Sequence, residues 1–384
     1  MTAGRLHEYG TSIVLDEVPA PLPGPGEVVV HVEGSGFSRS EIHVIDGEVR
    51  VLPRLPVTLG HENAGTVAAT GPGVTAVREG DPVAVYGGWG CGRCDYCLTG
   101  HEPLCDEPQW AGLSARDGGY ADYLLVPHER YLVRLTTLKP AEAAPLTDTA
   151  LRPYHAIRKA SALIDPERHV LLIGFGGRGE YALKLLHVLA GCPVIVVDLA
   201  PAKLHFAREL GAARALDARS PDVAAQIRDL TGGHGVNASF DFVGTDATLA
   251  LAVAATRPLG KVTQVGLAGG TARMKVLDNT RFEVLFEATA AGSFKELREV
   301  IALAESGRLT PIPLEFAPLE QIHDIYTRVK RGEVQGRVVI TPALHGPDSY
   351  SDLDDRARAA ASDRRRDAGA GHWGRRITDH PEAA

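Results

Sequence analysis

A glycine-rich loop between a predicted strand and a predicted helix constrains the fold of this chain more than any other feature. The apolar stretch His169–Gly174 runs into Gly174-Phe175-Gly176-Gly177-Arg178-Gly179, and the apolar-periodic segment Tyr181–Ala190 follows. This order is typical of a dinucleotide-binding unit, because glycines let backbone N–H groups approach a pyrophosphate at a helix N-terminus. A glycine-rich loop in another α/β protein, such as a methyltransferase, is the alternative.

An acidic residue favours the dinucleotide over that alternative. Asp198 ends the next predicted strand, Pro193–Asp198, where a carboxylate accepts hydrogen bonds from ribose hydroxyls. A carboxylate there repels the 2′-phosphate of NADP(H), so the sequence predicts NAD(H) as cofactor. These predicted cofactor-binding residues are Gly174, Gly176, Gly177, Gly179 and Asp198.

The pattern of predicted elements changes near residue 165 and indicates an α/β protein with two domains. Before that point, short β-branched runs such as Glu27–Val32 and Asp81–Tyr86 alternate with Gly/Pro turns, which predicts a β-rich domain. After it, strands and helices alternate, which predicts a parallel sheet with right-handed crossovers. The later elements that we expect are a helix at Pro201–Leu210, strands at Ala238–Val243 and Lys261–Val265, a helix at Arg298–Ser306 and a strand at Arg337–Ile340.

Four of the five cysteines lie within fifteen positions and predict a metal site. Their spacing is C-x-x-C-x-x-C followed by seven residues and a cysteine, and four thiolates so close can hold one Zn²⁺ tetrahedrally. Four protein ligands leave no open position, so we expect this zinc to be structural. The predicted ligands are Cys91, Cys94, Cys97 and Cys105. An odd number of cysteines does not suggest a secreted disulfide framework.

Composition excludes several classes of function. Lys plus Arg number 40 and Asp plus Glu 48, giving a net charge of −8, which argues against a general nucleic-acid or anionic-membrane binder. The N-terminus has no apolar run behind a basic start, and no stretch approaches a membrane span, so we expect a cytoplasmic protein. The Ala/Asp/Arg-rich stretch 343–384 is predicted to be a disordered tail.

Several motifs in the right order carry a family resemblance. They are PxPGPGEVVV at 21–30, LGHENAGTV at 59–67, the cysteine cluster, PLTDTALRPYHA at 145–156, the glycine-rich loop and GRVVI at 336–340. With these, residues 1 to about 342 resemble the zinc-dependent alcohol dehydrogenases of the medium-chain dehydrogenase/reductase superfamily. The resemblance implies a GroES-like β-rich catalytic domain at 1–152 and 294–342, and a Rossmann NAD-binding domain at 153–293. It also implies a homodimer or homotetramer.

The resemblance implies a catalytic zinc site with one departure. Such enzymes usually hold that zinc with a Cys, the His of the GHE motif and a second Cys or an Asp. His61 and Asp148 match the second and third ligands, whereas Ser38 stands where the cysteine is expected. A neutral hydroxyl is a far poorer zinc ligand than a thiolate. Glu62 is close enough in sequence to substitute.

The resemblance also implies a proton relay and further cofactor contacts. Ser40 matches the hydroxyl that relays the alcohol proton, His43 a histidine that passes it to solvent, and Glu41 the acid that orients the zinc-bound histidine. The further cofactor contacts are Arg39, Lys203, Val243, Val265 and Arg337.

A second departure, Arg152, leaves the metal question open. The family usually has a threonine there, near the nicotinamide. A cation at this position can pair with Asp148 and neutralise it without zinc, contact the cofactor, or bind an anionic group of the substrate. Either zinc is retained through His61, Asp148 and Glu62 or water, or the site is zinc-free. The sequence therefore predicts an NAD(H)-dependent oxidoreductase acting on a small-molecule alcohol, aldehyde or ketone. The alternatives are a zinc-free reductase of an activated C=C or C=N bond and an NADH-binding pseudoenzyme.

Overall fold

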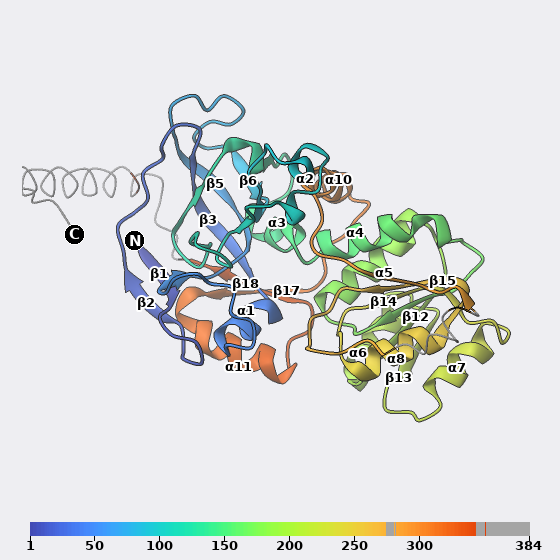
Figure 1. Cartoon of the computed structure of the whole chain (residues 1–384). Coiled ribbons are helices and arrows are strands. Elements are labelled where there is room, and N and C mark those ends of the chain that lie inside the picture. The colour runs from blue at the N-terminus through green and yellow to red at the C-terminus, as the bar shows by residue number, and fades with distance from the viewer. Residues whose placement is uncertain (274–279, 281, 343–349, 351–384) are drawn as a thin grey trace, which may run out of the picture.

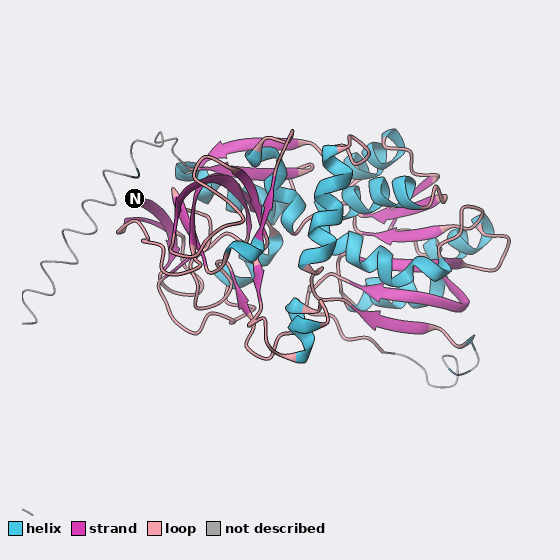
Figure 2. Ribbon diagram, turned by 90° about the horizontal axis from the view of Figure 1, so that it is seen from above, coloured by secondary structure: helices cyan, strands magenta, loops and turns pink. Residues whose placement is uncertain are grey.

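The structure is a computed structural model that describes residues 1–273, 280, 282–342 and 350. Its strands form two large sheets, one in the left half and one in the right half of the molecule in Figure 1. Figure 2 shows helices between these two groups of strands. Among the described residues, no helix is both long enough and apolar enough to cross a bilayer. Apart from Tyr350, the predicted tail lies outside the described residues.

The first sheet has seven strands and draws its members from both ends of the described chain. Its order is β10-β6-β5-β3-β18-β17, with β9 also paired to β3. The strands span Val28–Phe37 (β3), Glu62–Thr70 (β5), Pro82–Val85 (β6), Tyr123–Val126 (β9), Leu132–Arg134 (β10), Leu314–Pro318 (β17) and Arg337–Thr341 (β18). The C-terminal strand β18 lies antiparallel to β3, so the chain returns to its first sheet as the resemblance implies.

Smaller elements surround this sheet. Two short sheets are ordered β2-β1-β4 and β7-β8. Their strands span Thr2–Leu6 (β1), Val14–Glu17 (β2), Val57–Thr58 (β4), Gly88–Trp89 (β7) and Gln109–Trp110 (β8). The helices of this half are Arg39–Ile45 (α1), Asp95–Leu98 (α2), Pro140–Ala143 (α3), Phe294–Glu305 (α10) and Ile322–Arg331 (α11).

The second sheet is parallel and has the order β13-β12-β11-β14-β15-β16. This order, in which the first strand lies next to both the second and the fourth, is that of a doubly wound dinucleotide-binding fold. Its strands span Val170–Ile173 (β11), Val194–Asp198 (β12), Arg214–Asp217 (β13), Val236–Asp241 (β14), Thr256–Gln264 (β15) and Leu285–Ala288 (β16). Its helices are Leu151–Ala160 (α4), Gly177–Leu189 (α5), Pro201–Glu209 (α6), Val223–Leu230 (α7) and Asp246–Ala255 (α8).

The sequence explains where the glycine-rich loop lies in the second sheet. All four residues of β11 are buried, as expected for a central parallel strand covered on both faces. The strand therefore ends inside the molecule, and the glycine-rich loop follows at its carboxyl end. Ligands of such sheets bind at the carboxyl ends of the strands, near the switch in strand order. The domain boundary predicted between residues 152 and 153 lies within helix α4.

Candidate functional site

The N-terminus of α1 places the serine that stands in the expected cysteine position. Ser38 is the N-cap of this helix, and its Oγ accepts a hydrogen bond of 2.9 Å from the Ser40 N–H. Glu41 completes a capping box, because its Oε2 accepts the Ser38 N–H at 2.9 Å. The hydroxyl of Ser38 is therefore occupied in holding the helix end.

Three predicted metal ligands converge beside this helix end. His61, Glu62 and Asp148 are fully or almost fully buried, and one ligand atom of each lies within 4.8 Å of the others. His61 Nδ1 is hydrogen-bonded to Glu41 Oε1, which fixes the plane of the ring. His61 Nε2 is buried without a hydrogen-bond partner among the described residues, and Asp148 Oδ2 lies 3.5 Å from it.

Guanidinium groups hold both carboxylates of this cluster. Arg152 Nε donates to Asp148 Oδ1 at 2.6 Å, and Arg178 Nη2 donates to Asp148 Oδ2 at 2.8 Å. Arg337 forms a two-pronged ion pair with Glu62, and its Nε donates to Oε2 at 3.0 Å. Neither carboxylate therefore keeps an oxygen free of a cation.

These charges change the protonation of the buried groups. Burial alone would lower the pKa of His61, but the carboxylates of Glu41 and Asp148 outweigh it and raise this pKa to about 10. Burial alone would raise the pKa of Asp148, but Arg152 and Arg178 hold this pKa well below its usual range. The site is thus a network of ion pairs at neutral pH.

As these side chains lie, the set does not fit a catalytic zinc ion. The separations of His61 Nε2 from Asp148 Oδ2 (3.5 Å) and Glu62 Oε1 (4.0 Å) are close to those of tetrahedral ligands. Charge is the obstacle, because Zn²⁺ about 4 Å from one guanidinium is opposed by roughly 8 kcal/mol at an effective dielectric constant near 20. Ser38 offers no compensating negative charge. These contacts therefore do not support the catalytic zinc that the resemblance implies.

The cysteine cluster, in contrast, fits zinc. One Sγ atom of each of its four residues lies within 4.8 Å of the others, and none is in a disulfide. The Cys94 and Cys105 sulfurs are 3.9 Å apart, close to the roughly 3.8 Å edge of a tetrahedron with 2.3 Å Zn–S bonds. Backbone N–H groups of Arg93 and Cys94 donate to Cys91 Sγ and lower the pKa of this thiol to about 6.

The glycine-rich loop forms an open cradle at the N-terminus of α5. Gly174 has a φ of +89°, and a Cβ on Gly179 would lie 2.3 Å from the Gly174 carbonyl oxygen, so both positions require glycine. A Cβ on Gly176, the N-cap, would meet nothing within 4 Å, and no side chain of the described residues caps the helix. Unpaired N–H groups beside open space fit a pyrophosphate.

The other predicted cofactor residues occupy several positions around this cradle. Asp198, at the carboxyl end of β12, accepts hydrogen bonds from the N–H groups of Phe175 and Ala200. Val243 lies against Gly174, Val265 is buried, and Lys203 is half-buried on α6. Arg39 is exposed in the first turn of α1, whereas Arg337 is committed to Glu62.

The predicted relay residues share one helix but make different contacts. Ser40 Oγ lies 3.4 Å from Arg178 Nη2, inside the cluster. His43 Nδ1 is hydrogen-bonded to Glu48 Oε2 at 2.5 Å, and its side chain is 22% exposed. The structure thus places Ser40 at the cluster and His43 on the solvent side.

Sequence reasoning missed Arg178. Its side chain leaves the second residue of α5 and reaches across to Asp148 and Ser40 in the other half of the molecule. A signal was present in the sequence, because an arginine inside a glycine-rich loop places a cation beside the predicted cofactor site.

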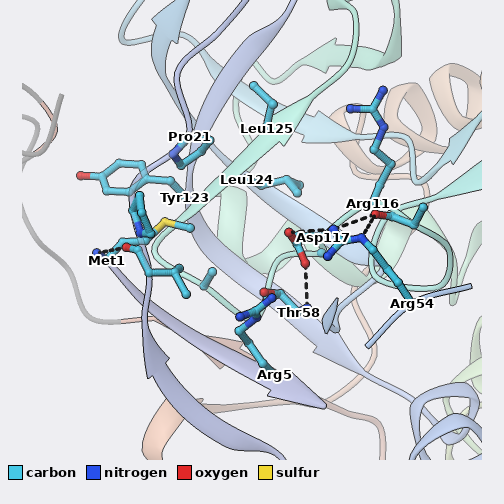
Figure 3. Close-up of a pocket in the computed structure, with 15 residues that line it drawn as sticks. Met1, Arg5, Pro21, Arg54, Thr58, Arg116, Asp117, Tyr123, Leu124 and Leu125 are labelled. Atoms are coloured by element: carbon cyan, nitrogen blue, oxygen red, sulfur yellow. Dashed lines mark hydrogen bonds and ion pairs between the residues drawn. The ribbon is translucent and has the colours of Figure 1, made fainter. Parts of the chain in front are cut away.

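One cavity among the described residues lies away from this cluster. It has a volume of about 570 Å³ and includes none of the predicted site residues. Figure 3 shows Asp117 in its wall, bonded to the Thr58 N–H and paired with Arg54. We do not assign the reaction to this cavity, because the chemistry-bearing side chains converge at the cluster.

Comparisons with known proteins agree with this architecture. Residues 24–137 match the family "Alcohol dehydrogenase GroES-like domain", and residues 177–306 match "Zinc-binding dehydrogenase". An NAD-dependent alcohol dehydrogenase of Sulfurisphaera tokodaii is 35% identical over 350 residues, covering 89% of this chain and all of that protein. An alcohol dehydrogenase of Geobacillus stearothermophilus is 33% identical, covering 88% and 99%.

A solved structure shows the same likeness in three dimensions. The alcohol dehydrogenase of Aeropyrum pernix superposes with a TM-score of 0.84 at 33% identity, over 89% of this chain and all of that one. The fold of this chain thus agrees with that of the relative over most of its length. This chain belongs to the zinc-type medium-chain alcohol dehydrogenase family.

Proposed function

We propose that the protein is an NAD(H)-dependent oxidoreductase that interconverts a small-molecule alcohol and its aldehyde or ketone. One observation carries this proposal most directly: Arg178, in the loop that would bind the cofactor, lies within 3.4 Å of the Ser40 hydroxyl. The cofactor cradle and the proton-relay hydroxyl are therefore adjacent. The alcohol dehydrogenase relatives support the reaction type.

The cradle and the cluster have separate roles in this reaction. The loop glycines and Asp198 would hold NAD(H), which supplies or accepts a hydride when bound. Ser40 passes the substrate's proton, and His43, at the exposed end of the same helix, exchanges it with solvent. Glu41 orients His61 through its hydrogen bond to Nδ1. We further propose that the four cysteines hold one structural zinc ion.

We also propose the domain bounds given by the resemblance, 1–152 with 294–342 and 153–293. The pairing of β18 with β3 supports the return of the chain to its first domain.

We propose a homodimer or homotetramer in the cytoplasm. Strand β16 ends the parallel sheet, and Leu285 on it is 58% exposed, with Leu259 and Leu267 also exposed. An apolar strand at a sheet edge favours pairing with a second copy. Light scattering on the purified protein tests this, and a monomer would contradict it.

A second function has its own support. Because Asp148 and Glu62 are both paired with arginines, a zinc-free reductase of an activated C=C or C=N bond is the competing assignment. An NADH-binding pseudoenzyme is the third.

Cofactor binding and turnover together separate these functions. NADH fluorescence titration is expected to show binding, weakened in Asp198→Ala, whereas Asp217→Ala, at the neighbouring strand end, serves as a matched control. NADH oxidation is then followed with aldehydes and ketones and, separately, with activated alkenes and imines. Turnover of carbonyls alone supports the proposal. Turnover of alkenes or imines alone supports the reductase, and binding without turnover supports the pseudoenzyme.

A further inference from the structure

We propose that Arg178 supplies the positive charge at the reacting oxygen, in place of a catalytic metal ion. This inference rests on the proposed function, because it names the group that polarises the carbonyl in that reaction. It also explains why the residues expected to hold zinc are paired with arginines instead.

The position of Arg178 is the first argument. Its Nη2 is 2.8 Å from Asp148 Oδ2 and 3.4 Å from Ser40 Oγ, so the guanidinium lies between the carboxylate and the relay hydroxyl. The Asp148 oxygen that it holds is the one 3.5 Å from His61 Nε2. The cation therefore occupies the region in which a metal bound by His61 and Asp148 would lie.

The second argument is that Arg152 and Arg178 differ in their hydrogen-bond partners. Arg152 binds Asp148 Oδ1 through Nε and the Ala290 carbonyl through Nη1, so it is committed to anchoring the carboxylate. Arg178, by contrast, has a buried Nε with no partner among the residues that the structure describes. A buried donor without a partner is costly, and a substrate oxygen would satisfy it. Arg152 is a positioning residue, and Arg178 is the candidate electrophile.

The chemistry requires nothing beyond these groups and the cofactor. When bound, reduced nicotinamide supplies a hydride with its electron pair. As the new C–H bond forms at the carbonyl carbon, the C=O π bond breaks and its electron pair moves to the oxygen. Arg178 donates hydrogen bonds to that oxygen as negative charge develops. The Ser40 hydroxyl gives the oxygen a proton and regains one from solvent, so carbonyl, hydride and proton yield the alcohol.

The inference also narrows the substrate class. A guanidinium donates hydrogen bonds but, unlike Zn²⁺, does not strongly lower the pKa of a bound hydroxyl. The guanidinium therefore stabilises the negative charge that develops on a carbonyl oxygen during reduction, but it does little to ionise a neutral alcohol for oxidation. We expect aldehydes or ketones, used in the direction of reduction, to be the better substrates.

The experiment removes the guanidinium and returns it as a free ion. Arg178→Ala is expected to lower kcat for carbonyl reduction by about 100-fold or more, with KM changed by less than about threefold. Millimolar guanidinium chloride is expected to raise the kcat of Arg178→Ala at least about tenfold, whereas the same concentration of sodium chloride leaves this kcat unchanged. Arg158→Ala, an exposed arginine on α4, is the matched control and keeps the wild-type kcat.

Further readouts keep the test decisive. The wild type is expected to contain about one zinc ion per chain, that of the cysteine cluster. Arg178→Lys keeps a positive charge beside Asp148, so this variant is expected to fold even if Arg178→Ala does not. Its kcat is expected to fall at least about tenfold, because the planar guanidinium is lost. A second bound zinc in the wild type would overturn the inference. So would a wild-type kcat in either variant, or no guanidinium rescue in a folded Arg178→Ala that binds NADH.

Failure of the proposed function gives a different result. In that case the wild type binds NADH but reduces no carbonyl, and kinetics report nothing about Arg178. The role of Arg178 at a carbonyl then fails with the proposed function, and zinc content shows separately whether the His61–Asp148 cluster holds a metal: about one ion per chain means that it does not, and two mean that it does.

Discussion

The cysteine cluster and the His61–Asp148 cluster are both groups of potential metal ligands, yet they differ in what surrounds them. Around the four sulfurs, backbone N–H groups donate to the Sγ atoms of Cys91 and Cys105, and no guanidinium is paired with these atoms among the described residues. Beside His61, three arginines form ion pairs with carboxylate oxygens: Arg152 and Arg178 with Asp148, and Arg337 with Glu62. Ligand geometry alone does not distinguish the two sites, since both sets of atoms lie within 4.8 Å. The charges of the neighbours do distinguish them.

The largest expected effect is loss of the cysteine-cluster zinc. Cys97→Ser is expected to reduce zinc from about one ion per chain to near zero, because tetrahedral sites need all four thiolates. Since structural zinc contributes on the order of 10 kcal/mol to folding of small zinc domains, the Tm should fall by on the order of 10 °C. Elemental analysis and thermal unfolding measure both.

Cys192→Ser is the control for that substitution. Cys192 is buried and outside the cluster, so the variant loses some stability but keeps its zinc. Equal zinc in the wild type and Cys97→Ser would show that the cysteine cluster is not a metal site.

The second prediction converts one kind of site into the other. Ser38→Cys combined with Arg152→Thr and Arg178→Leu is expected to raise zinc from about one to about two ions per chain, because a thiolate is added and two cations are removed. Ser38→Cys alone is expected to stay near one, because the guanidinium groups remain. A second zinc in the single variant would mean that the missing thiolate, and not the arginines, keeps the site empty.

The third prediction concerns the Glu62–Arg337 ion pair. Glu62→Gln leaves the buried Arg337 guanidinium without its carboxylate, and losing one partner of a buried pair costs about 3–5 kcal/mol of unfolding free energy. Chemical denaturation measures this loss. A change below about 1 kcal/mol would show that Glu62 is not held as an ion pair and remains available as a ligand.

The smallest effect concerns Glu180, a buried carboxylate with no guanidinium partner among the described residues. Burial raises the pKa of Glu180 to about 7, while the Gly336 N–H offsets part of this. A folded-state pKa above the unfolded value gives stability that is full below about pH 4.5 and lost as the pH rises through about 7. We expect a decline of about 2–3 kcal/mol across that range.

Glu180→Gln isolates this contribution. The difference in unfolding free energy between wild type and variant should change with pH, in favour of the variant above about pH 7. A difference that is constant from acid to alkaline pH would show that Glu180 titrates at its ordinary value.

The backbone followed from the sequence more closely than the side-chain network did. The strand predicted at 169–174 is β11 (Val170–Ile173), because a short apolar run followed by glycine is typical of a buried strand in an α/β protein. The helix expected from Arg298 begins instead at Phe294, because Ser293 and Glu296 form a capping box one turn earlier. Local pattern thus located elements, and only cap chemistry set their ends.

The cysteine cluster was predictable because its ligands lie close in sequence, whereas the pairing of Asp148 was only half predictable. Arg152 is four residues from Asp148, about one helical turn away, and this spacing predicts their pairing as one possibility. Arg178 is thirty positions away and reaches Asp148 only through the packing of two domains. The assigned roles of Ser40, His43 and His61 remain predictions.

The origin of Arg178 in the cofactor-binding half has a consequence for motion. Ser38, His61 and Asp148, which a metal would need, all belong to the other half, so a metal ion would stay at the substrate however the two halves moved. Arg178, in contrast, lies on α5, so its guanidinium would move together with the nucleotide-binding half. If the two halves moved apart, Arg178 would separate from Ser40, so we expect the proposed reaction to require the arrangement in which they are in contact.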